Sequence, residues 1–198
     1  MIRSFVVFLA KEKNTNMSTK RMTLTAMTSC IIIISSWITI PFAVPFSMQT
    51  FAVFFSLLLL GGKDGFISVC LYILLGAIGL PVFSGFRGGI GHLIGPTGGY
   101  IFGFVLLAFL YMLSEPIILK KKSLKPFVLF AGLVLCYTAG TFWYSLMYKG
   151  NEYNGFWKIA SVCVFPYVIF DLIKLWLAFF TVKRVKNLLE LRKIDTFY

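Results

Sequence analysis

The chain has 198 residues, of which 59% are hydrophobic and only 13% are charged. A soluble domain of this length carries about 25% charged residues, so the composition indicates an integral membrane protein. The formal net charge of +12 does not indicate nucleic-acid binding, because the basic residues lie at the ends of apolar segments and not on one soluble face.

Six apolar segments follow one another along the chain, near residues 23–41, 48–61, 66–80, 97–118, 126–147 and 159–182. A spanning helix needs about 20 residues, and the second and third segments are shorter than that. Short segments are tolerated where they line a cavity, but tilted or capped helices explain them equally well. We therefore predict an all-α integral membrane protein, a bundle of six transmembrane helices over residues 21–183.

The positive charges predict the orientation of this bundle. Fifteen of the 19 lysine and arginine residues lie before the first segment, between the second and third, between the fourth and fifth, or after the sixth. The positive-inside rule then places both termini in the cytoplasm. Residues 1–20 form a cytoplasmic extension, although Met17 or Met22 is an equally good start, and residues 184–198 form a cytoplasmic tail. The loops near 42–47, 81–96 and 148–158 face outward from a plasma membrane.

Two classes of active site are excluded by the motifs. Gly62-Lys63 is followed by Asp64, so the chain has no P-loop, and no Ser/His/Asp set with a useful spacing is present. His92 is the single histidine and lies in a loop, where a lone histidine is more often incidental than catalytic. The four cysteines are far apart in apolar segments, which indicates buried small hydrophobes and not a metal site or disulfides. We expect a protein that is not an enzyme.

The segment between residues 76 and 103 is rich in glycine. Its densest part, Gly85–Gly95, predicts a compact loop over a binding site, and close helix packing explains Gly76 and Gly103. Gly98 and Gly99 open the fourth segment, where free backbone N–H groups attract a carboxylate or carbonyl. Before the second segment, the stretch 40–50 contains two prolines and Gln49. It predicts either a lid that offers the Gln49 amide to a ligand, or a plain connection.

The sixth segment contains two charges inside its apolar run, Asp171 and Lys174. Each costs about 2.5–3.5 kcal/mol at a bilayer centre, so such residues tend to face a partner or a ligand. Residues three positions apart lie on one face of a helix. The two side chains therefore either pair with each other or converge on one polar object. If Pro166 starts the helix instead of kinking it, Asp171 lies about 7–8 Å along it. That depth predicts a ligand pocket near the outer face.

Five sequence motifs together resemble the BioY family, the biotin-binding S components of energy-coupling factor (ECF) transporters. They are Pro-x-x-x-Pro-x-x-x-Gln-Thr, Tyr-x-x-x-Gly-x-x-Gly-Leu-Pro-Val-Phe, Gly-Pro-Thr-Gly-Gly-Tyr, Asp-x-x-Lys and Tyr-x-x-Gly-x-x-Trp. Here they fall at residues 41–50, 72–83, 95–100, 171–174 and 137–143. Each motif alone is modest, but their order and spacing are specific, and the resemblance covers about residues 20–183.

The resemblance implies a membrane subunit that captures biotin from outside and delivers it inward when partner subunits use ATP. The implied partners are a membrane coupling protein and cytoplasmic ATPases, with surrounding membrane lipid, no nucleic acid and no cofactor. Asp171 would accept the ureido N–H bonds of biotin and Lys174 would donate to its carbonyl. The other candidate binding residues are Gln49, Tyr72, Phe83, Arg87, Gly98, Gly99, Tyr100 and Tyr137. The alternatives are an S component for a different vitamin, or a structural membrane protein with an Asp171–Lys174 ion pair.

Overall fold

A computed structural model describes residues 19–40, 46–147 and 156–195. These residues form eight α-helices, a 3₁₀ turn and one small hairpin. In chain order the elements are α2 (Thr19–Trp37), β1 (Thr39–Ile40), β2 (Phe46–Ser47), α3 (Gln49–Leu60), α4 (Gly62–Ala77), α5 (Ile90–Ile94), α6 (Gly98–Lys120), η1 (Lys122–Leu124), α7 (Lys125–Met147), α8 (Phe156–Cys163) and α9 (Phe165–Asp195).

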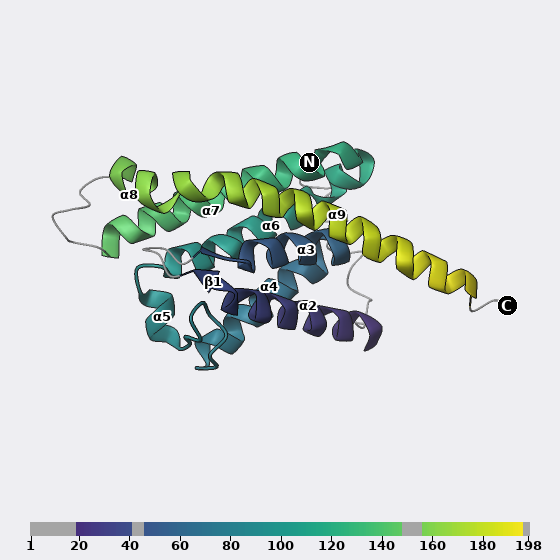
Figure 1. Cartoon of the computed structure of the whole chain (residues 1–198), viewed down its shortest axis with the longest axis horizontal. Coiled ribbons are helices and arrows are strands. Elements are labelled where there is room, and N and C mark those ends of the chain that lie inside the picture. The colour runs from purple at the N-terminus through teal and green to yellow at the C-terminus, as the bar shows by residue number, and fades with distance from the viewer. Residues whose placement is uncertain (1–18, 41–45, 148–155, 196–198) are drawn as a thin grey trace, which may run out of the picture.

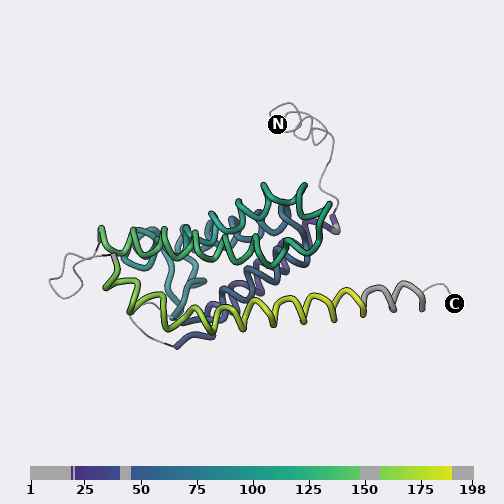
Figure 2. Tube along the Cα trace, turned by 90° about the horizontal axis from the view of Figure 1, so that it is seen from above, coloured from purple at the N-terminus to yellow at the C-terminus, as the bar shows by residue number. Residues whose placement is uncertain are grey.

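The long helices run side by side and divide the molecule into two ends (Figure 1). α6 packs against α7 and α4, α3 packs against α9, and α2 packs against α3 and α4. The start of α2, the α3–α4 turn and η1 lie at one end. The hairpin, α5 and α8 lie at the other. α9 runs along one side of the bundle and extends past the other helices (Figure 1 and Figure 2).

Apolar side chains cover both the inside and the outside of this bundle. Leu107 and Leu133 are buried between helices, whereas Phe127 and Trp176 expose more than two thirds of their surface. A helix that is apolar all round suits a lipid environment. Three stretches are long and apolar enough to cross a membrane: Gly98–Lys120, Lys122–Met147 and Phe165–Leu188. The prediction of an all-helical membrane protein is thus confirmed.

The predicted segments differ from the observed helices at three places. The first segment ends at Trp37 and not near residue 41, because the chain enters β1. The sixth segment is divided at residue 164 into α8 and α9, and Pro166 lies in the first turn of α9, where a missing N–H costs nothing. α9 then continues past residue 183 to Asp195. The predicted loop Gly85–Gly95 contains the short helix α5.

Glycine sets the close approach of α6 and α7. A Cβ atom on Gly103 would lie 2.6 Å from Cys136 Sγ and 3.0 Å from Cys136 Cα, so no larger residue fits without displacing α7. Small residues at a helix–helix interface let the backbones approach closely. At the far end of the bundle, Arg21 donates to both carboxylate oxygens of Asp64, at 2.7 and 2.9 Å.

We expect Gly103→Ala to destabilise the bundle by about 1–3 kcal/mol, because the added methyl group overpacks the α6–α7 contact. Gly91→Ala is the matched control, since a Cβ atom there meets nothing within 4 Å. The free energy of unfolding, measured by titrating detergent micelles with SDS, compares the two variants. Equal stability of both variants would contradict the packing assigned to Gly103.

Candidate ligand-binding site

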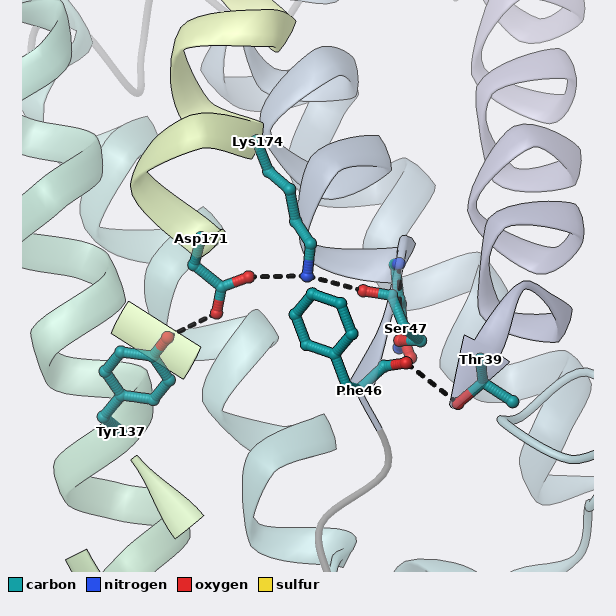
Figure 3. A network of polar contacts seen from close by, with 7 residues as sticks. Thr39, Phe46, Ser47, Tyr137, Asp171 and Lys174 are labelled. Carbon is teal, nitrogen blue, oxygen red and sulfur yellow. Dashed lines mark hydrogen bonds and ion pairs between the residues drawn. The ribbon is translucent and has the colours of Figure 1, made fainter. Parts of the chain in front are cut away.

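The two charges of the sixth segment form a buried ion pair on α9. Lys174 Nζ lies 2.7 Å from Asp171 Oδ1, and the two residues are only 5% and 4% exposed. Their spacing places them on one face of the helix, as predicted, and that face is turned toward the protein interior (Figure 3). The pair therefore neutralises itself in a region that contains little water.

Each member of the pair has a second partner from another element (Figure 3). The Tyr137 hydroxyl, on α7, donates to Asp171 Oδ2. Lys174 Nζ donates to the backbone carbonyl of Ser47, on β2, at 2.7 Å. The same ammonium lies 3.8 Å from the centre of the Phe46 ring, within cation–π range. The pair thus connects α7, α9 and the hairpin.

The hairpin is fixed to α9 mainly through Phe46. Its ring stacks on Tyr167, with ring centres 5.8 Å apart, and meets Phe170 edge-on at 5.3 Å. β2 pairs with β1, and Thr39 Oγ1 adds a hydrogen bond to the Phe46 carbonyl at 3.2 Å. The prolines of the predicted lid, at 41 and 45, lie outside the described residues. The described part of that stretch covers the Asp171–Lys174 pair.

A cavity opens beside the ion pair at the hairpin end of the bundle. Its empty volume is about 710 Å³, part of which is open to solvent. The described residues that line it come from the hairpin, α3, α5, α6, α7, α8, α9 and the α4–α5 loop: Phe46, Ser47, Gln49, Thr50, Ser84, His92, Thr97, Tyr100, Ile101, Phe104, Leu133, Cys136, Tyr137, Cys163, Tyr167, Asp171 and Lys174.

Five of the ten candidate binding residues line this cavity: Asp171, Lys174, Gln49, Tyr100 and Tyr137. Gln49 Nε2 donates to the Tyr72 hydroxyl at 2.9 Å, which fixes the amide at the start of α3. The Tyr100 hydroxyl lies 3.3 Å from Thr141 Oγ1. Sequence segments separated by more than 100 residues therefore converge on one wall.

The other five candidates lie behind the cavity wall or away from it. Tyr72 and Phe83 are completely buried, with their rings edge to face at 5.5 Å. Gly98 and Gly99 are contact points, because a side chain there would collide with Leu93 and Trp143. Arg87 is exposed on the tight turn that pairs it with Phe83. The structure thus shows a packing role for the two glycines, and the anion-attracting role of this helix end stays a prediction.

Several lining residues were missed by sequence reasoning. Ser84, His92 and Thr97 lie in the glycine-rich segment, and His92 was interpreted as incidental. Cys136 and Cys163 were interpreted only as buried small hydrophobes, and both are buried, yet they also line the cavity. A regional signal existed for Phe46, Ser47 and Thr50, which lie in the predicted lid, and for His92, which lies in the predicted loop Gly85–Gly95. Within the described ranges, no three His, Cys, Asp or Glu side chains are grouped to hold a metal.

The comparison with known proteins identifies the family. The BioY family model matches residues 11–191. The chain belongs to the BioY family. It is 43% identical to the biotin transporter BioY of Thermotoga maritima, over 81% of this chain and 92% of that protein. It is 33% identical to the probable biotin transporter BioY of Pyrococcus horikoshii, over 86% and 99%. The family predicted from the five motifs is confirmed.

A solved BioY-like structure agrees with the fold as well. The crystal structure of the S-component for biotin from an ECF-type ABC transporter superposes with a TM-score of 0.74 at 27% identity. The match covers 88% of this chain and 94% of that one. The described helices therefore have the S-component arrangement.

Removing one charge of the buried pair should cost more stability than removing both. Lys174→Met leaves Asp171 buried without its cation, which we expect to cost about 3–5 kcal/mol. The double variant Asp171→Asn with Lys174→Met should recover a large part of that loss. The free energy of unfolding of Lys174→Met, Asp171→Asn and the double variant is measured by titrating detergent micelles with SDS. A double variant that loses the sum of the two single losses would contradict mutual neutralisation.

Proposed function

We propose that this chain is the biotin-binding S component of an ECF transporter, which captures biotin from outside the cell for delivery inward. One observation carries this proposal: the Asp171–Lys174 pair lines a cavity in a chain of the BioY family. Two relatives, each matched over more than nine tenths of its length, are named as a biotin transporter and a probable biotin transporter. A buried charge pair that faces an open cavity is available to a guest.

The hydrogen-bonding capacity of the pair fits the ureido ring of biotin, which has two N–H donors and one carbonyl. A carboxylate offers about four acceptor sites, and Asp171 uses one for Lys174 and one for Tyr137. Two sites remain for the ureido N–H groups. An ammonium has three donors, and Lys174 uses one for Asp171 and one for Ser47. One donor remains for the ureido carbonyl.

The apolar body of the guest has its own surface in the cavity. Tyr100, Phe104 and Tyr137 present ring faces or edges, and Ile101 and Leu133 add aliphatic contact. Cavities lined mainly by apolar side chains with a few placed polar groups are typical of small-molecule sites. Buried polar groups left without partners penalise analogues that lack the matching N–H or carbonyl, which gives selectivity.

The two alternative functions make different predictions about this cavity. A purely structural ion pair needs no open volume beside it, and the volume favours a binding role. An S component for another vitamin would keep the volume but bind a different ring. Thermal unfolding of the purified protein with a panel of vitamins separates these cases, because a bound ligand stabilises the folded state by mass action.

The membrane orientation proposed from the charges agrees with the two ends of the bundle. The end of α9 lies at one end of the bundle, and the hairpin, α5 and α8 lie at the other (Figure 1). Residues of these three elements line the cavity. With the basic end in the cytoplasm, the cavity faces outward. In this proposal α2, α3 and α4 also cross the membrane, which gives six spans and two cytoplasmic termini. A coupling protein and ATPases supply the energy, since the chain has no P-loop.

We expect Asp171→Asn to weaken biotin binding at least about tenfold while the bundle stays folded. Hydrogen bonds to a charged acceptor contribute about 1.5–3 kcal/mol each, and 1.4 kcal/mol is a factor of 10 in affinity. Asp64→Asn is the matched control, because it removes a paired carboxylate at the opposite end. Calorimetric titration with biotin measures both. Unchanged affinity in Asp171→Asn would refute the site, and an equal loss in Asp64→Asn would show a general effect.

We also expect the purified chain in liposomes to show no uptake that depends on ATP. Adding the coupling protein and the ATPases should produce accumulation of labelled biotin only when ATP is present. ATP-driven accumulation by the chain alone would overturn the proposed division of labour between subunits.

A further inference from the structure

A second set of polar groups lines the cavity, on elements other than α9. Ser84 lies in the α4–α5 loop, His92 on α5 and Thr97 just before α6. Of the described lining residues, only His92 and Lys174 can carry a positive charge. Lys174 is already held by a carboxylate and a carbonyl. His92 is thus the remaining residue among the described lining residues that can become positively charged beside an anionic group.

The imidazole of His92 is held in place by packing against a buried aromatic ring. It stacks on the Phe83 ring, with centres 5.4 Å apart and planes inclined by 26°. Phe83 is itself buried against Tyr72. Hydrogen bonds fix both ends of α5. Before the helix, Gly89 N–H donates to the Gly76 carbonyl at 2.7 Å. After it, Trp143 Nε1 donates to the Gly95 carbonyl at 3.0 Å.

Burial, with a smaller effect of the Arg87 charge, favours the neutral form of His92. Burial lowers the pKa of the imidazole below its usual value, and the neighbouring positive charge of Arg87 lowers it further. The other titratable groups on the cavity wall are the Asp171–Lys174 pair, three tyrosines and two cysteines. The tyrosines and cysteines are neutral between pH 5.5 and 8; they are Tyr100, Tyr137, Tyr167, Cys136 and Cys163. Among these described groups, no unpaired acid competes for the histidine.

The two ends of the proposed guest have opposite requirements. The ureido ring is neutral and suits Asp171, whereas the valerate carboxylate would be repelled by that residue. The carboxylate therefore needs donors elsewhere on the wall. We propose that His92, with the hydroxyl groups of Ser84 and Thr97, receives the carboxylate of the guest and takes up a proton as it binds. This inference rests on the proposed function and assigns the second end of the same cavity.

The direction in which biotin affinity changes with pH follows from the linkage between ligand binding and proton binding. A carboxylate beside the imidazole favours its charged form, so the bound state has a higher His92 pKa than the empty state. Affinity should rise as the pH falls between these two pKa values, by at most about tenfold per pH unit. It should level off below the pKa of the empty state. The guest carboxylate itself remains ionised above pH 5.5.

The test is a calorimetric titration of the full chain with biotin and with biotinamide, whose amide replaces the carboxylate, from pH 5.5 to 8. Biotin should bind more tightly at low pH, with proton uptake visible as a heat that changes with the ionisation enthalpy of the buffer. Biotinamide should show neither effect. His92→Gln should abolish the pH slope and the proton uptake for biotin. His92 is the only histidine in the sequence, so no other imidazole contributes.

The outcomes separate the two proposals. Biotin affinity that is independent of pH, with no proton uptake, would overturn the role of His92 and leave the proposed function standing. An equal slope for biotinamide would overturn the carboxylate assignment in the same way. No biotin binding at any pH would overturn the proposed function itself. The comparison of biotin with biotinamide uses the unmodified chain, so the test does not depend on the folding of His92→Gln.

Discussion

The arrangement of this protein depends on two opposite charges buried on one turn of α9. Neither charge is tolerable alone in a membrane interior, so each must find a partner. Asp171 and Lys174 find each other, and their remaining capacity recruits the Tyr137 hydroxyl and the Ser47 carbonyl. Because those partners belong to α7 and the hairpin, satisfying the charges also brings these elements together. The cavity lies where they meet.

This arrangement would let a stable ion pair also bind the proposed ligand. Both groups are satisfied enough to remain buried, yet the carboxylate and the ammonium keep unused hydrogen-bonding sites. The hairpin covers the pair through Phe46, which contacts the ammonium and two aromatic residues of α9. On the other side, the α4–α5 loop and α5 add uncharged donors and the single histidine. In our proposal, one end of the cavity receives a neutral polar ring and the other receives an anion.

Much of the fold could be predicted because membrane helices leave a strong local signal. Each of the six apolar segments contains a helix, and Gly61 and Gly62 mark the α3–α4 turn as expected. The division between α8 and α9 was less visible, because the apolar run continues across residue 164 and only Pro166 marks the new start. Helix α5 was missed, since five residues among glycines give no periodic pattern. The small hairpin was missed for the same reason, being two residues per strand.

The sequence by itself determined the membrane class, the family and the Asp171–Lys174 face, because these depend on composition, on the order of motifs along the chain and on spacing within one segment, respectively. Only the tertiary structure decided that Ser47 and Tyr137 complete the pair, that Gly98 and Gly99 are packing contacts, and that His92 lines the cavity. The physical reason is the distance along the chain. Contacts between residues 30 to more than 100 positions apart arise from how helices pack, and no local pattern records which side chains then meet.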